Sequence, residues 1–67
     1  MAKVKPLRQL IYGQFDSEAA FARSLGWNRQ KLNRITNGDV LPSVKDVVEL
    51  ANGLGTTVDS IARIFLP

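Results

Sequence analysis

The sequence contains no cysteine and no histidine. Their absence excludes disulfide bonds, thiolate chemistry, the usual zinc sites and the commonest general base of enzymes. The six acidic residues remain, but they fall at expected helix starts or beside turns, where carboxylates normally cap helices. The sequence therefore predicts a protein that is not an enzyme and that uses no metal ion and no cofactor.

Long apolar runs are also missing. No stretch approaches the roughly 18 residues that a membrane span needs. The N-terminus carries Lys3 and Lys5 but no apolar run of the length that a signal peptide requires. We therefore expect a cytoplasmic protein without a membrane partner. Its 67 residues are expected to form one domain, residues 1–67, near the size at which a single core becomes marginal.

Acidic residues are absent from the stretch between Ala19 and Gly38. Residues 1–38 hold seven lysines and arginines against two acids, a net charge of +5, whereas residues 39–67 hold two against four, a net charge of −2. One basic end suits a protein that presents a single face to a polyanion. A merely solvated charged surface would have the same counts, so charge alone leaves both interpretations open.

The spacing of apolar residues predicts an all-α fold of five short helices and no sheet. Leu7, Leu10 and Ile11 follow an i, i+3, i+4 pattern that predicts a first helix over 4–14, with Pro6 tolerated in its first turn. Cap residues define the other four. These helices are expected from Asp16 or Ser17 to Leu25, from Asn28 to Asn37-Gly38, from Ser43 (with Asp46 as a capping box) to Gly55, and from Thr57 onward.

Each of the last four helices is expected to bury one apolar stripe. The stripes are Phe21, Ala22 and Leu25; Leu32 and Ile35; Val44, Val47, Val48, Ala51 and Leu54; and Val58, Ile61, Ala62 and Phe65. Ile64 and Leu66 fall outside the last stripe, which favours a dimer contact over closure of the intrachain core.

Residues 17–38 contain two amphipathic helical patterns joined at Gly26, a residue that tolerates the positive φ of a tight turn. The apolar pairs on the two helices point into a shared core, and Trp27 is expected to pack in front of the second helix. The rest of that helix is left exposed, namely Arg29, Gln30, Lys31, Asn33 and Arg34.

From Leu7 to Leu66 this pattern resembles the Cro and phage-repressor (XRE) family of DNA-binding domains. The residues that carry the resemblance are Phe21-Ala22-Arg23-Ser24-Leu25-Gly26, Leu32-Asn33-Arg34-Ile35, Asn37-Gly38, Pro42-Ser43, Leu50-Ala51 and Leu54-Gly55. The resemblance implies a compact lambda-repressor-like bundle in which the second and third helices form a helix-turn-helix. It also implies a transcriptional regulator, of phage or prophage type, that occupies a double-stranded DNA operator as a homodimer.

The resemblance further implies which residues meet DNA, with the recognition helix at residues 28–37 in the major groove. The implied base contacts are Arg29, Gln30, Asn33 and Arg34. The implied phosphate contacts are Ser17, Arg23, Lys31 and Asn37. Lys3 and Lys5 either touch the DNA backbone or remain solvated.

The sequence departs from the family pattern in two respects. Glu18 stands where members often carry a phosphate-binding glutamine, and an acid there is expected to cap its helix instead. Ile11 and Thr36 stand where many members pair an arginine with a glutamate, so that ion pair is expected to be absent.

A different class of function also fits the sequence: a protein–protein interaction module, such as an antitoxin or adaptor, that uses the same helical face. No small-molecule ligand is evident.

Overall fold

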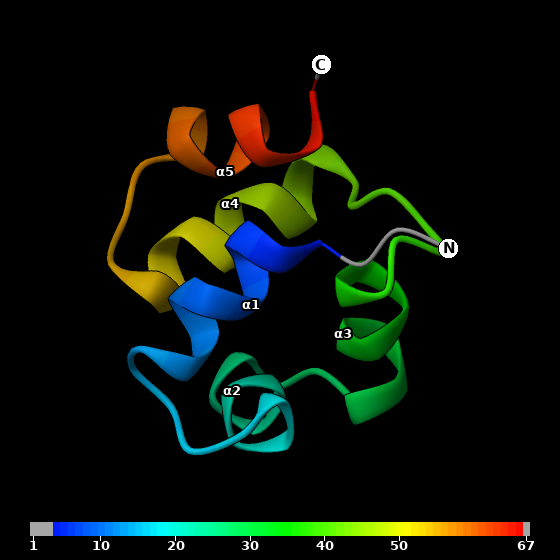
Figure 1. Ribbon diagram of the computed structural model, residues 1–67, viewed down its shortest axis with the longest axis vertical. Coiled ribbons are helices and arrows are strands. Elements are labelled where there is room, and N and C mark those ends of the chain that lie inside the picture. The colour runs from blue at the N-terminus through cyan, green and yellow to red at the C-terminus, as the bar shows by residue number, and fades with distance from the viewer. Residues whose placement is uncertain (1–3, 67) are drawn as a thin grey trace.

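The computed structural model describes residues 4–66, and this part of the chain forms five helices and no strand (Figure 1). The helices are α1 (Lys5–Tyr12), α2 (Glu18–Leu25), α3 (Arg29–Thr36), α4 (Val44–Leu54) and α5 (Val58–Phe65). The predicted all-α class is confirmed. The helix α1 is shorter than the predicted span 4–14 because it ends at its C-cap Gly13, after which the Gln14 N–H bonds Ile11 O at 3.0 Å in a tighter turn.

Side chains at the predicted positions cap four of the helices. Ser17, rather than Asp16, caps α2 by accepting the Ala20 N–H, and Asn28 caps α3 by accepting the Lys31 N–H. Ser43 caps α4 and forms a reciprocal capping box with Asp46, and Thr57 caps α5. Each cap satisfies N–H groups that the first turn of a helix leaves without a partner.

The turn between α2 and α3 depends on Gly26, which ends α2 in the left-handed region at φ +75°. A side chain at this φ would be strained, so the turn requires glycine. At the end of α3 only Gly38 has a positive φ, whereas Asn37 stays right-handed at φ −81°. The helix therefore ends at Asn37-Gly38 as expected, with Asn37 as its C-cap, but only the glycine adopts the left-handed backbone.

The core lies where α1, α2, α3, α4 and α5 meet, and it contains one buried polar residue, Thr36, among the described residues. The buried apolar side chains are Leu7, Ile11, Phe21, Ala22, Leu32, Ile35, Leu50, Ala51, Leu54 and Ile61. Trp27 and Leu25 are half-buried against this cluster, as predicted.

Three predicted core valines are exposed instead: Val44 (82% exposed), Val48 and Val58. Val44 and Val58 lie in the first turns of their helices, and Val48 lies about 100° around α4 from Val47, at the edge of the buried stripe. Leu50, which the predicted stripe left out, is buried in their place.

The end of α5 also differs from prediction. Ile64 is half-buried and packs against the core, because it lies three residues after the buried Ile61 and shares its side of the helix. Leu66 follows the last turn and is 66% exposed, as expected.

Candidate nucleic-acid interface

The outer face of α3 carries a run of exposed polar side chains. The exposed residues are Arg29, Gln30, Lys31, Asn33 and Arg34. On the opposite side of the helix, Leu32 and Ile35 are buried in the core, so α3 cannot rotate without exposing them. The predicted division of this helix into a buried and an exposed face is confirmed.

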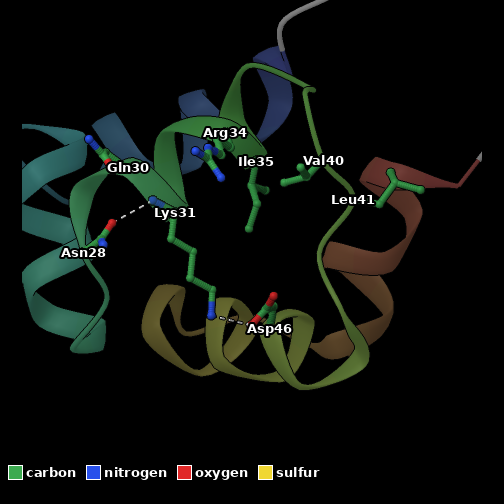
Figure 2. Close-up of a pocket in the computed structure, with 8 residues that line it drawn as sticks. All are labelled: Asn28, Gln30, Lys31, Arg34, Ile35, Val40, Leu41 and Asp46. Carbon is green, nitrogen blue, oxygen red and sulfur yellow. Dashed lines mark hydrogen bonds and ion pairs between the residues drawn. The ribbon is translucent and has the colours of Figure 1, made fainter.

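Lys31 connects the start of α3 to α4 (Figure 2). Its Nζ lies 2.9 Å from Asp46 Oδ1 and 4.3 Å from the centre of the Trp27 ring. Burial raises the pKa of Asp46, but hydrogen bonds from Lys31 and Ser43 lower it more, and the net pKa lies below its usual value. Asp46 thus joins α3 to the N-terminal capping box of α4.

A pocket of about 240 Å³ opens between α3, the segment that follows it and the start of α4 (Figure 2). Its lining is Asn28, Gln30, Lys31, Arg34, Ile35, Val40, Leu41 and Asp46. A second hollow beside the same helix is lined by Asn28, Arg29, Gln30 and Asn33. The structure therefore brings three of the four predicted base-contact residues to one hollow and places the fourth, Arg34, at the other.

The side chains of Arg29, Gln30 and Arg34 make no hydrogen bond and no ion pair within residues 4–66. Within this part of the chain, nothing therefore competes with an external partner for their donors and acceptors. Such groups on a rigid convex helix suit the edges of bases.

Glu18 has a different role from the predicted cap. Its carboxylate accepts hydrogen bonds from Thr36 Oγ1 at 2.6 Å and from Tyr12 OH at 3.1 Å, and it lies 3.5 Å from Arg8 Nε. The hydrogen bond to Glu18 raises the pKa of Tyr12. Glu18 thus links α2 to both α1 and α3.

As expected, Ile11 and Thr36 form no ion pair, but a different ion pair links the first helix to α2. Arg8 supplies the arginine from α1, and Glu18 supplies the acid from α2. Sequence reasoning missed this cluster because its members are distant in the chain, with 18 residues between Glu18 and Thr36. The sequence held only a weak indication of this ion pair, namely an acid in the first turn of α2 and a basic residue, Arg8, on the preceding helix.

The predicted phosphate contacts lie around the ends of α2 and α3. Ser17 is half-buried at the α2 N-terminus, and Arg23 is exposed in the last turn of that helix. Asn37, at the end of α3, accepts a hydrogen bond from Arg8 Nη2 at 2.7 Å and donates from Nδ2 to Asn33 Oδ1 at 2.9 Å. Lys5 is exposed, and Lys3 lies outside the described residues.

Across residues 4–66, no three histidine, cysteine, aspartate or glutamate side chains gather in a way that could hold a metal ion. No helix in that part of the chain has the length and apolar character needed to cross a membrane.

The family described as helix-turn-helix domain matches residues 17–64. The chain belongs to this family. The match begins at the cap of α2 and reaches into α5, so it covers the helix-turn-helix of α2 and α3 and the two helices that follow. It confirms the resemblance to Cro and repressor proteins and the lambda-repressor-like fold of this helix-turn-helix domain. No curated protein and no solved structure matches the chain.

Proposed function

We propose that this helix-turn-helix protein is a sequence-specific regulator of transcription that binds double-stranded DNA. It acts by occupying an operator, in the manner of a phage or prophage Cro or repressor protein. The observation that carries the proposal is the outer face of α3, where five exposed side chains are all cationic or amide. A convex helix with this chemistry suits the major groove.

The proposed base contacts are Arg29, Gln30, Asn33 and Arg34. An arginine fork matches the two acceptors of guanine, O6 and N7, whereas an amide matches N6 and N7 of adenine. Arg29, Gln30 and Arg34 have no competing partner within the described residues, which supports a role in reading DNA.

The proposed phosphate contacts are Ser17, Arg23, Lys31 and Asn37. Ser17 lies at the N-terminus of α2, where the helix dipole favours an anion. The Lys31 ammonium has three N–H donors, so its bond to Asp46 leaves others for a phosphate. These contacts would hold α3 in register without reading sequence.

We also propose that the protein binds DNA as a homodimer, since one small module reads few base pairs. An apolar groove of about 170 Å³ supports this proposal. Its lining is Leu41, Pro42, Val47, Ala62, Phe65 and Leu66. Leu41 is 78% exposed at its rim and can fill the same groove of a second copy, which is the self-complementarity that a two-fold interface requires.

The test of function is selection of binding sites from a random duplex library at physiological salt. We expect an enriched sequence with two-fold symmetry and half-sites about one helical turn apart. If nothing is enriched but binding still falls steeply with salt, the protein binds DNA without specificity. A stable complex with another protein, without affinity for DNA, would identify an interaction module instead.

Variants of α3 test the assignment of roles. Arg29→Ala and Gln30→Ala should each reduce discrimination between the selected site and random DNA by about tenfold. Lys31→Ala should weaken binding to all duplexes about equally and reduce the salt slope by about 0.9. Arg63→Ala is the matched control, because it removes an exposed arginine on α5 that pairs with Asp59. If the three α3 variants bind like the parent protein, α3 is not the recognition helix.

A further inference from the structure

Asn33 is bound into a chain of hydrogen bonds that has a fixed direction. Arg8 Nη2 donates to Asn37 Oδ1 at 2.7 Å, and Asn37 Nδ2 donates to Asn33 Oδ1 at 2.9 Å. A guanidinium only donates, so Asn37 must face Arg8 with its oxygen. On its other side Asn37 presents its NH₂ group to Asn33, and because an NH₂ group only donates, Asn33 accepts with its own oxygen.

The orientation of the Asn33 carboxamide therefore follows from Arg8. With Oδ1 turned to Asn37, the remaining polar group of Asn33 is its NH₂ group. That group has no hydrogen-bond acceptor within residues 4–66, and Asn33 is exposed beside Gln30 on the outer face of α3.

Arg8 itself is held in place. Its Nε lies 3.5 Å from Glu18 Oε2, and its side chain is 23% exposed. Glu18 is held in turn by Thr36 and Tyr12, which come from two other helices. The start of the chain of hydrogen bonds is thus anchored to three helices. This anchoring extends through Asn37 to the exposed Asn33.

We propose that Arg8 and Asn37 determine base specificity at a distance, by making Asn33 a hydrogen-bond donor toward the major groove. This inference rests on the proposed function. A donor matches bases that present acceptors there, and guanine, with both O6 and N7, matches it best. An unconstrained asparagine would favour adenine, because it could offer oxygen and nitrogen together.

Replacing Asn37 with aspartate reverses the direction of the hydrogen bond to Asn33 and keeps that of the bond from Arg8. Aspartate accepts at both oxygens, so one oxygen keeps Arg8 and the other faces Asn33. Asn33 must then turn its NH₂ group inward and leave its oxygen toward the groove. An outward acceptor matches the amino groups of adenine N6 or cytosine N4 and disfavours guanine.

The experiment is binding-site selection with sequencing for the parent protein, Asn37→Asp, Asn33→Ala and the double variant. Asn33→Ala identifies the position that Asn33 reads, because preference there should vanish. At that position Asn37→Asp should change the ratio of guanine to adenine or cytosine by about tenfold, with the other positions unchanged. In the Asn33→Ala background the aspartate should alter no preference.

Ratios of bases within one variant cancel the uniform loss of affinity that a new negative charge near DNA causes. Circular dichroism confirms that each variant is folded. If the parent protein enriches no sequence, the proposed function fails, and this inference with it. If the parent enriches a sequence and Asn37→Asp enriches the same one, only the role of Arg8 and Asn37 is overturned.

Discussion

The hydroxyl of Thr36 offers a direct measure of the polar cluster that joins α1, α2 and α3. Thr36 is fully buried, and its Oγ1 lies 2.6 Å from Glu18 Oε1 and 3.1 Å from Asn33 O. A hydroxyl has one proton, so the shorter contact with the charged acceptor takes it. Thr36→Val keeps the shape of the side chain and removes only this hydrogen bond.

The magnitude follows from two opposing effects. A hydrogen bond to a charged group stabilises a protein by about 1.5 to 3 kcal/mol. Burial of the new methyl group stabilises the folded state by roughly 0.8 kcal/mol and offsets part of this loss. The free energy of unfolding should therefore fall by about 1 to 2 kcal/mol. For a chain of this size that loss lowers Tm by about 5 to 15 °C.

Thermal and urea unfolding, followed by circular dichroism, measure the effect. Thr56→Val is the matched control, because Thr56 is half-buried and its hydroxyl has no hydrogen-bond partner within the described residues. The control should change stability by less than about 0.5 kcal/mol. If Thr36→Val and Thr56→Val have the same stability, the bond to Glu18 contributes nothing and the argument is wrong.

Three further changes test other parts of the structure. Gly53→Ala should lower stability by about 1 kcal/mol despite its better helix propensity, because the new Cβ would lie 2.6 Å from Leu25 Cδ2 and 3.0 Å from Phe21 Cε1. Asn52→Ala, on the exposed side of α4, should instead stabilise slightly, and equal gains at both sites would contradict the packing argument. Asp46→Asn should lower Tm at neutral pH, and the difference from the parent should vanish as pH falls below 3.8 through the lowered pKa of Asp46. A pH-independent difference would exclude the carboxylate as its cause. Leu41→Asp should convert a dimer to a monomer in analytical ultracentrifugation, whereas Val58→Asp, away from the groove, should not.

Features that depend on neighbours in the chain could be predicted from the sequence. Each cap joins residues three apart, as Ser17 joins Ala20, so the residue types alone indicate it. The exposed face of α3 follows from helical periodicity in the same way.

Features that depend on distant partners could not be predicted. Periodicity indicates which side of α4 is apolar but not where the neighbouring helices end, so Val44 was expected in the core. Glu18 accepts a hydrogen bond from Thr36, 18 residues away in the chain, and no local sequence pattern predicts that contact. The close approach of α4 to α2 at Gly53 is likewise a property of the assembled fold.

The lack of intramolecular partners at Arg29, Gln30 and Arg34 has an evolutionary consequence. Because no hydrogen bond or ion pair in residues 4–66 depends on these side chains, substituting them leaves the fold nearly as stable as before. Under the proposed function, mutation of these residues can then alter the DNA sequence that is recognised in single steps, each through a folded intermediate. Asn33 differs under the further inference, because its orientation depends on Asn37 and Arg8, so its specificity also changes when either of those two residues is substituted.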